Sequence, residues 1–375
     1  MRETGILMPV SSLPSHTGVG ELGKETEKFI GYLRVSGVKI WQILPLNPVG
    51  YGNSPYQPYS SCAGDEIYIS LEKLWEQKLL KELPVSELAG STRVQYEQVR
   101  TWKETYLREA FQAFIEKGLD RQRSIRRLLH RNGCRNTDCS VHLRKQTEDS
   151  AGMTGSRNIK TGRNTKRKLR KRSEKRQTIS LLQYLFYCPV DGNEECCKCK
   201  WDPHYGGRAV LCRGGFCRCV GGKEKLLLDT DGRPIFIAGV PPDYFSATGQ
   251  RWGNPIYDWE YLKKQNYQFW VDRIGYSSRL FDIIRIDHFR AFDTFWKIPA
   301  SCPTAVEGEW ILAPGYEVID TLLEKIPEVN LVAEDLGDLR PEVLELKEHY
   351  HFKGMKILVF SIDTSGKYAK DIFMM

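Results

Sequence analysis

An arginine and a carboxylate lie two positions apart at the end of an apolar segment, and of all the residues in the sequence these are the best suited to chemistry. Ile283, Ile284 and Ile286 indicate a short buried strand of the parallel kind. Because side chains alternate across a strand, Arg285 and Asp287 are expected on one face. A guanidinium near Asp287 favours the ionised carboxylate, as a nucleophile or a charge-stabilising group requires at neutral pH. An ion pair that only closes the strand is the structural alternative.

A second apolar segment, 329–333, ends in another carboxylate, Glu334. The 47 positions from Asp287 to Glu334 have room for a loop, a helix and a return strand, so the two strands are predicted to be parallel neighbours. In a (β/α)8 barrel the active site lies at the carboxyl ends of the strands. The sequence therefore predicts that the two carboxylates lie side by side.

Paired carboxylates suggest chemistry at a glycosidic bond, where one group attacks the sugar and the other gives a proton to the leaving oxygen. Asp287 is the better nucleophile because Arg285 holds it ionised. Glu334 is the better acid, since a nearby negative charge raises its pKa.

Two strings carry a family resemblance. RIDHFRAF, from Arg285 to Phe292, resembles the nucleophile strand of the 4-α-glucanotransferases of glycoside hydrolase family 77, also called amylomaltases, and AEDLG, from Ala333 to Gly337, resembles their acid/base strand. The resemblance covers roughly residues 1–117 and 226–360. It implies an α/β fold, a (β/α)8 TIM barrel. It also implies retaining double displacement without cofactor or metal, acting on α-1,4-glucans and maltooligosaccharides with glucose as an acceptor.

The resemblance further implies which residues contact the glucan. Four belong to a loop rich in Tyr and Gly, 48–61, on the donor side, and four to the acceptor-side segment 239–255, which is also expected to be a loop. Without the resemblance, aromatic loops packed on a barrel rim and a structural histidine remain the alternatives. Asn53 stands where the family usually has Asp. The implied contacts are Tyr51, Ser54, Tyr56 and Gln57, then Tyr244, Phe245, Gln250 and Trp252, and finally His288 beside the nucleophile.

The start of the chain predicts a βαβ unit. Strands are expected over 5–10 and 38–44, and Phe29, Ile30 and Leu33 fall at helical spacing between them. With 375 residues and 41% hydrophobic composition, a large core is possible. The N-terminus lacks a basic region followed by a long apolar run, and no stretch approaches about 18 apolar residues. A cytoplasmic protein without a membrane partner is therefore expected.

The segment 118–225 differs in kind from the rest. From Lys117 to Gln177 there are 20 Lys or Arg against 5 Asp or Glu, and this local excess is larger than the net charge of +8 of the whole chain. The positive net charge of the chain thus comes from this one segment, and it says nothing about the binding partners of the other residues. Nine of the 11 cysteines also lie here.

Three interpretations of this segment remain open. A zinc site is one, although the spacings of the cysteines in 196–219 and of His204 show neither a CxxC pair nor a regular gap. A nucleic-acid arm is another, based on the basic run 166–172, which lacks interleaved aromatic residues; solvated disorder is the plain version of the same pattern.

The third interpretation, out-of-frame translation, is favoured over zinc and nucleic-acid binding. One permissible set of codons for Trp201 to Lys223, taken one base later, spells GIHIMGDVPFYVAEDSADVWAG, which resembles the family's next barrel strand. The stretch from Lys145 to Thr161 gives RGQRWYDWEQEYKD two bases later in the same way, and 181–187 is similar to the family as it stands.

These observations divide the chain into three parts. Residues 1–117 are predicted to form the N-terminal part of the barrel, 118–225 an aberrant segment, and 226–375 the part with the acceptor loop and both catalytic strands. A further strand is expected over 355–360, and the barrel is expected to lack its last strands and a third carboxylate. An inactive, truncated or frameshifted chain that only binds α-glucan, or nucleic acid or zinc through 118–225, is the alternative function.

Overall fold

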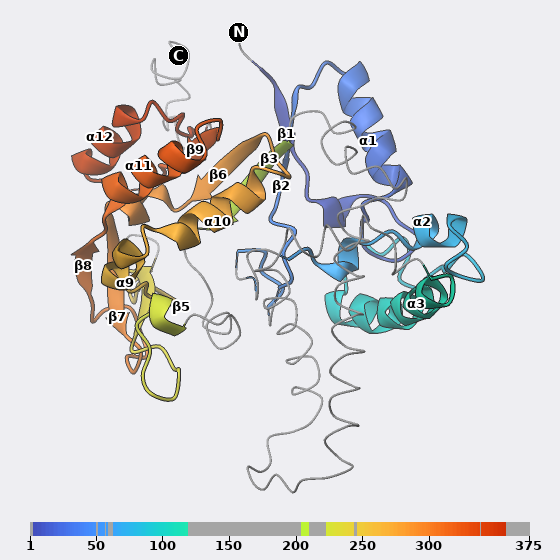
Figure 1. The fold of residues 1–375 in the computed structure, drawn as a ribbon, viewed down its shortest axis with the longest axis horizontal. Coiled ribbons are helices and arrows are strands. Elements are labelled where there is room, and N and C mark those ends of the chain that lie inside the picture. The colour runs from blue at the N-terminus through green and yellow to red at the C-terminus, as the bar shows by residue number, and fades with distance from the viewer. Residues whose placement is uncertain are drawn as a thin grey trace, which may run out of the picture. The chain divides into compact units, whose positions relative to one another are not determined.

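The structure, a computed structural model, describes residues 3–49, 52–56, 58, 63–118, 204–209, 223–243, 246–337 and 339–357, with 204–209 as backbone only. The chain divides into two compact units, shown in Figure 1. The N-terminal unit comprises Met1–Tyr205 and Arg213–Lys223, and the C-terminal unit comprises Gly206–Cys212 and Glu224–Met375. The predicted division at 117 and 225 stays a prediction, because most of 118–225 lies outside the described residues. The part that is described there includes strand β3, His204–Ala209.

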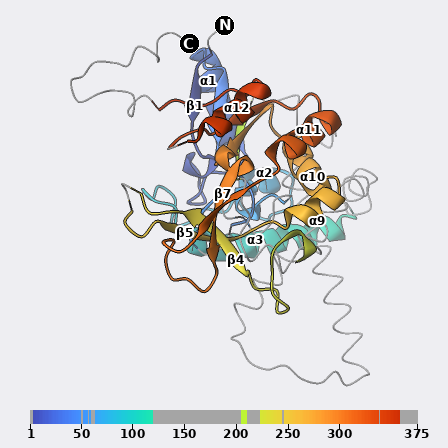
Figure 2. The ribbon, with the colours of Figure 1, turned by 90° about the vertical axis from the view of Figure 1, so that its left-hand side faces the viewer.

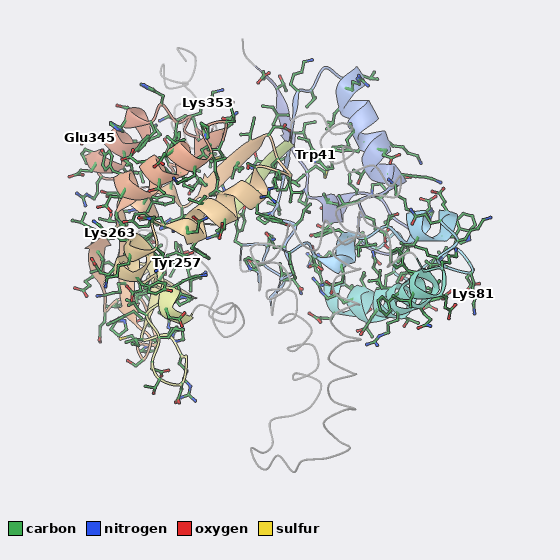
Figure 3. All side chains as sticks on the ribbon, in the orientation of Figure 1. Trp41, Lys81, Tyr257, Lys263, Glu345 and Lys353 are labelled. Carbon is green, nitrogen blue, oxygen red and sulfur yellow. The ribbon has the colours of Figure 1, made fainter. Side chains whose placement is uncertain are left out.

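The N-terminal unit begins with the expected βαβ unit. Strands β1, Gly5–Leu7, and β2, Ile40–Ile43, are parallel, and helix α1, Lys24–Val35, lies between them in the chain. β1 is shorter than expected because a 3₁₀ helix, η1, Val10–Ser12, begins directly after Pro9. Trp41 of β2, labelled in Figure 3, is buried against the ring of Phe29 on α1, with ring centroids 5.2 Å apart. The helix is thus fixed on the strand by an aromatic pair.

Two further helices follow in this unit. A 3₁₀ helix, η2, Glu66–Tyr68, leads into α2, Leu71–Glu76, which begins at Ser70, whose hydroxyl accepts a hydrogen bond from Lys73 N at 3.3 Å. α3, Tyr96–Glu116, buries residues three or four positions apart, as a helix packed on one face does. These buried residues are Val99, Lys103, Leu107, Ala110 and Phe114.

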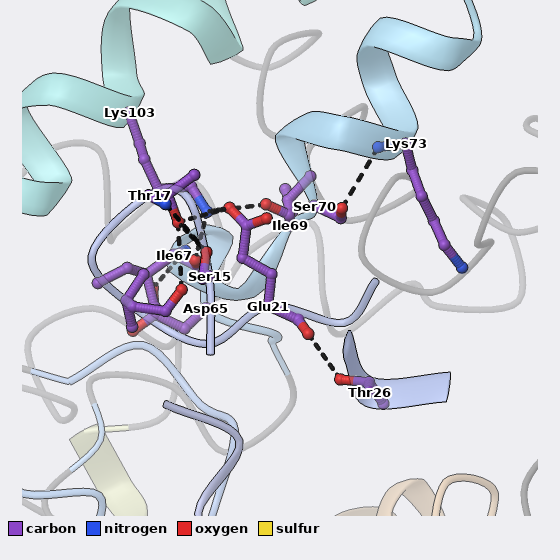
Figure 4. A network of polar contacts seen from close by, with 11 residues as sticks. Ser15, Thr17, Glu21, Thr26, Asp65, Ile67, Ile69, Ser70, Lys73 and Lys103 are labelled. Atoms are coloured by element: carbon purple, nitrogen blue, oxygen red, sulfur yellow. Dashed lines mark hydrogen bonds and ion pairs between the residues drawn. The ribbon is translucent and has the colours of Figure 1, made fainter. Parts of the chain in front are cut away.

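One of these buried positions is a lysine, and its ammonium group is fully engaged (Figure 4). Lys103 Nζ donates to Ile67 O at 2.7 Å and to Ile69 O at 2.8 Å, and it forms an ion pair with Glu21. Glu21 accepts a further hydrogen bond from Thr17 Oγ1 at 3.0 Å. Burial lowers the pKa of Lys103 against the attraction of Glu21. The network ties α3 to the segments around η2 and before α1.

The C-terminal unit contains two sheets. β6, Ile283–Asp287, and β9, Leu331–Ala333, are parallel. The other sheet is antiparallel and has the order β5–β4–β7–β8; β4, β5 and β7 are labelled in Figure 2. Its strands are β4, Phe236–Val240; β5, Gln250–Pro255; β7, Thr294–Pro299; and β8, Glu309–Leu312.

The connection from β6 to β9 confirms the predicted loop, helix and return strand. A 3₁₀ helix, η5, Phe289–Phe292, and the β7–β8 hairpin come first, and α11, Gly315–Lys325, then leads back to β9. The remaining helices of this unit are the 3₁₀ helix η4, Lys223–Lys225, at its boundary, α9, Trp259–Lys264, α10, Gln268–Ser277, and α12, Pro341–His349.

Two predictions of secondary structure in this unit need correction. The acceptor-side segment, expected to be a loop, contains β5, because Gln250 and Arg251 pair with Val240 and Gly239 of β4. The strand expected over 355–360 is not present in its described part, 355–357. Instead, Lys353, labelled in Figure 3, forms a parallel bridge with Val332 of β9.

Buried rings support the end of β6. Trp270 of α10 is 1% exposed and lies against Phe292 and Tyr257, with ring centroids 5.1 and 5.6 Å apart. Phe289 is buried and contacts Phe352 at 6.1 Å. Because buried aromatic side chains contribute large apolar areas, η5 is held firmly after the strand. Among the described helices, none is both long and apolar enough to cross a membrane.

Candidate active site

Asp287 and Glu334 lie at the carboxyl ends of neighbouring strands, as predicted. Ile286 of β6 is opposite Ala333 of β9, so the next residue of each strand carries one of the carboxylates. Backbone hydrogen bonds continue past the pair, since Glu334 N donates to Ile286 O at 3.0 Å and Phe289 N donates to Glu334 O at 3.2 Å. The two residues are therefore held by the sheet and not by a free loop.

Arg285 and Asp287 form the ion pair predicted from their spacing, through Nη1 and Oδ1. Arg285 is buried, whereas the Asp287 side chain keeps 29% of its surface exposed. Within the described residues, Arg285 is the one hydrogen-bond or ion-pair partner of Asp287. Asp287 is thus paired with a buried arginine while part of its own side chain stays accessible, as a group that must reach a substrate requires.

The Glu334 carboxyl is held by backbone amides. His288 N donates to Oε2 at 2.7 Å, and Leu336 N donates to Oε1 at 3.3 Å. Burial raises the pKa of Glu334, and the negative charge of Asp287 adds to this, while the two amides and Arg285 act in the opposite direction. The net shift is upward, as a general acid requires. The sequence predicted the charge effect of Asp287 but not the larger effect of burial.

His288 is placed by its backbone conformation. It has φ 55° and ψ 50°, the left-handed region that few residues other than glycine adopt, and this turn aims its amide at Glu334. Burial, together with the charge of Arg290, lowers the pKa of His288 to about 4. The imidazole is therefore neutral at pH 7 and can both donate and accept a hydrogen bond.

Two of the acceptor-side residues join this group. The ring of Trp252 on β5 meets the ring of His288 edge to face, with centroids 4.9 Å apart. Trp252 Nε1 donates to Gln250 Oε1 at 3.1 Å, which orients both side chains. The structure therefore brings together Arg285, Asp287, His288, Glu334, Gln250 and Trp252.

The other predicted contacts stay predictions. Ser54 and Tyr56 are described in the N-terminal unit. Tyr51, Gln57, Tyr244 and Phe245 lie outside the described residues. Asn53 has φ 50°, a left-handed conformation that Asn and Asp adopt more readily than most residues, so its backbone suits either residue.

Sequence reasoning missed three residues close to the pair. Met355 Sδ lies 3.1 Å from Arg285 Nε, and Asp335, next to Glu334, binds both Met355 N at 2.6 Å and Lys347 Nζ at 2.8 Å. The one available signal was the second acidic residue of the AEDLG string. Within the part of the chain that the structure describes, no cluster of His, Cys, Asp or Glu could hold a metal ion. The proposed zinc cysteines lie outside that part.

An arginine-paired carboxylate beside a second carboxylate of raised pKa, on adjacent parallel strands, defines an α/β enzyme equipped for glycosidic-bond chemistry. The 4-alpha-glucanotransferase family model, glycoside hydrolase family 77, matches residues 8–373. The chain belongs to this family and is a transferase that acts on α-glucans.

Individual relatives agree with the family match. A 4-alpha-glucanotransferase of Thermus thermophilus is 36% identical, over 96% of this chain and 73% of the relative, and one of Aquifex aeolicus is 33% identical, over 96% and 74%. A solved structure, amylomaltase from Streptococcus agalactiae in complex with acarbose, is 30% identical with a TM-score of 0.87, over 98% of this chain and 76% of that one. The fold is therefore that of amylomaltase.

Proposed function

We propose that Asp287 is the nucleophile and Glu334 the general acid and base of a 4-α-glucanotransferase that works by retaining double displacement. The observation that carries this assignment is the arrangement at the strand ends. Arg285 pairs with Asp287, while Glu334 is fixed by the His288 amide and has a raised pKa. The two carboxylates thus differ in environment, and groups with different environments take different roles in one reaction.

In the first step an oxygen of Asp287 attacks the anomeric carbon of the donor glucan. The glycosidic bond breaks as Glu334 gives its proton to the leaving oxygen, which departs as the shortened glucan. The donor segment remains attached to Asp287 through an ester. Arg285 stabilises the free carboxylate before attack and its return afterwards.

In the second step the 4-hydroxyl of an acceptor glucan, or of glucose, replaces the leaving group. Glu334, now ionised, takes the hydroxyl proton while the oxygen attacks the anomeric carbon and Asp287 is released. The new α-1,4 bond keeps the configuration of the old one because each step inverts it once. Maltooligosaccharides thus serve as donors and acceptors.

Selection of a sugar hydroxyl over water requires an acceptor surface that binds sugar. We assign this role to Trp252, oriented by Gln250, and to the neutral imidazole of His288, which together offer an apolar ring and hydrogen-bonding groups. By resemblance, Tyr244 and Phe245 are proposed as further glucan contacts on the acceptor side. The donor-side residues Tyr51, Ser54, Tyr56 and Gln57 are likewise proposed as glucan contacts, to be tested by alanine substitution.

The resemblance also supports a closed (β/α)8 barrel as the architecture of the family, and we retain the cytoplasmic location as a prediction. The direct test of the function is to incubate residues 1–375 with maltotriose and follow glucose and longer maltodextrins by chromatography. Both products are expected, without a requirement for added metal. Release of glucose and maltose without longer maltodextrins would show hydrolysis and overturn the transferase assignment. No observation on the described residues favours the alternative of a chain that only binds glucan.

A further inference from the structure

Asp335 is held as tightly as Glu334 but faces different partners. Its side chain is 4% exposed, and each carboxylate oxygen has its own donor: Oδ2 accepts from Lys347 Nζ of α12 at 2.8 Å, and Oδ1 accepts from Met355 N at 2.6 Å. A buried carboxylate with both oxygens engaged is a rigid support. Asp335 therefore connects β9 both to α12 and to the segment that follows α12.

The backbone around Met355 is fitted to this carboxylate. A Cβ at residue 354 would lie 2.2 Å from Asp335 Oδ2, so only glycine leaves room for the side chain at this place. Ala333 N donates to Lys353 O at 2.8 Å, and Val332 and Lys353 form a parallel bridge. The segment 353–355 thus lies along β9, and Asp335 fixes its end.

Met355 then reaches back to the catalytic pair. Its thioether Sδ accepts a weak hydrogen bond from Arg285 Nε at 3.1 Å. Arg285 in turn pairs with Asp287 through Nη1. A continuous path of contacts therefore leads from Asp335 through Met355 and Arg285 to Asp287.

We propose that Asp335 is a positioning residue for the nucleophile, which acts by fixing Met355 so that its sulfur orients the Arg285 guanidinium against Asp287. This inference rests on the proposed function, because it assigns Asp287 the attacking role. Lys347 has a different part: it neutralises the buried Asp335 charge and supports the fold. Activity should accordingly depend on whether residue 335 can accept the hydrogen bond from Met355 N. Stability should depend on the ion pair between residue 335 and Lys347.

Substitutions on the full chain separate these two parts. Asp335→Ala removes the acceptor, whereas Asp335→Asn keeps a carbonyl oxygen for Met355 N and serves as the conservative rescue. Lys347→Met breaks only the ion pair, and Met355→Leu keeps the volume but removes the sulfur. Glu342→Gln is the matched control: it lies on the same helix as Lys347 and removes an exposed ion pair with Arg340, the residue just before that helix.

The readout is fluoride release from α-maltotriosyl fluoride, which reports the nucleophilic step, together with KM and the thermal unfolding midpoint. Asp335→Ala should lower kcat about tenfold and Met355→Leu about threefold, with KM within about twofold, because small displacements of reacting groups are costly. Asp335→Asn and Lys347→Met should keep kcat within about twofold but unfold at lower temperature. The control should change neither quantity.

Met355→Leu with the wild-type kcat would overturn the inference, as would Asp335→Ala whose activity falls only in proportion to its folded fraction. If Asp335→Ala fails to fold, Met355→Leu decides. Asp287→Asn is measured in parallel: if it releases fluoride at the wild-type rate, the proposed function fails at its nucleophile. If it is inactive while Met355→Leu and Asp335→Ala keep the wild-type kcat, only the positioning role fails.

Discussion

Each unit of the chain contains a cation paired with a carboxylate, and the two pairs differ in what surrounds them. In the N-terminal unit Lys103 is 1% exposed, all three ammonium hydrogens have acceptors, and Glu21 is bound by Lys103 and Thr17. In the C-terminal unit the Asp287 side chain is 29% exposed and keeps one partner among the described residues. A closed, fully satisfied pair is architectural, whereas a pair with an accessible carboxylate is available for chemistry.

The largest effect on activity is expected from a substitution of Asp287. We expect Asp287→Asn to lower transfer from maltotriose by at least about a thousandfold, because an amide cannot form the glycosyl ester. The thermal unfolding midpoint should stay within a few degrees of the wild type, as the side chain is partly exposed. Glucose release and thermal unfolding measure the two quantities. Wild-type transfer in this variant would place the nucleophile elsewhere.

The role of Glu334 is tested with two donors that differ in their leaving group. Glu334→Gln should slow transfer from maltodextrin by about a hundredfold to ten-thousandfold, since the leaving oxygen then receives no proton. The first step with α-maltotriosyl fluoride should slow by less than about tenfold, because fluoride leaves without one. The two donors are compared in single-turnover assays. An equal loss on both would indicate that Glu334 is structural.

The raised pKa of Glu334 also has a consequence for stability, with a definite sign. In the folded protein Glu334 keeps its proton at pH values where the unfolded chain has already lost it, so the folded state binds more protons there. The contribution to stability is complete below the ordinary carboxyl pKa and is lost as pH rises through the raised value. Urea unfolding of the wild type and of Glu334→Gln above about pH 4 should show this slope in the wild type alone.

Breaking the buried pair of Lys103 and Glu21 should lower stability and leave activity unchanged. Lys103→Met leaves Glu21 buried without its cation, and we expect the free energy of unfolding to fall by about 3–5 kcal/mol. The matched control is Arg108→Gln on the same helix, which breaks an exposed pair with Glu104 and should cost less than about 1 kcal/mol. Activity per folded molecule should be unchanged in both. A loss of kcat in folded Lys103→Met would show that the comparison is wrong.

The smallest expected effect concerns His288. Its pKa of about 4 lies below the ordinary value, so the unfolded chain takes up the proton first and stability falls as pH decreases from about 6.5 toward 4. Between pH 7 and pH 5 the loss should reach up to about 2 kcal/mol. His288→Gln should remove this dependence, whereas His349→Gln, at an exposed position on α12, should keep it. Urea unfolding at the two pH values measures the difference.

The strand ends could be predicted from sequence because they obey local rules. Apolar residues on both sides of Arg285 indicate a buried strand, and the period of two then fixes the common face of Arg285 and Asp287. The interval from Asp287 to Glu334 is long enough for the crossover that parallel strands require. The direction of the Glu334 pKa shift followed from the expectation that Asp287 is close by, but burial, the larger cause, was not predicted.

The remaining contacts could not be predicted because no local pattern encodes them. Met355 and Arg285 are 70 positions apart, and a methionine beside a charged group has no sequence signature. The left-handed turn at His288 is accompanied by a hydrogen bond from its amide to Glu334, which directly follows another strand. β5 is a strand because β4 lies beside it, and its own residues, Gln-Arg-Trp-Gly-Asn-Pro, do not favour one.

The interpretation of the segment 118–225 depends on the reading frame of its DNA. The family match of residues 8–373 runs through 118–225, and the structure describes β3 within it. The out-of-frame interpretation remains a prediction, and sequencing the encoding DNA across codons 117–226 tests it. An uninterrupted frame with the printed residues would return the zinc and nucleic-acid interpretations to consideration.

The order of strands in the antiparallel sheet has a consequence for the rate of folding. β4 pairs with β5, and β7 pairs with β8, its next neighbour in the chain, across the connections 241–249 and 300–308. Phe236 of β4, by contrast, must find Pro299 of β7 across the whole of β5, α9, α10 and β6. Hairpins close in microseconds, whereas pairings between distant segments must first overcome the entropy of a long loop. Trp252 is carried by the first hairpin and reaches His288 only when β4 and β7 have joined. The acceptor surface should therefore be among the last parts of this unit to form, and Trp252 fluorescence should follow the slow phase of refolding.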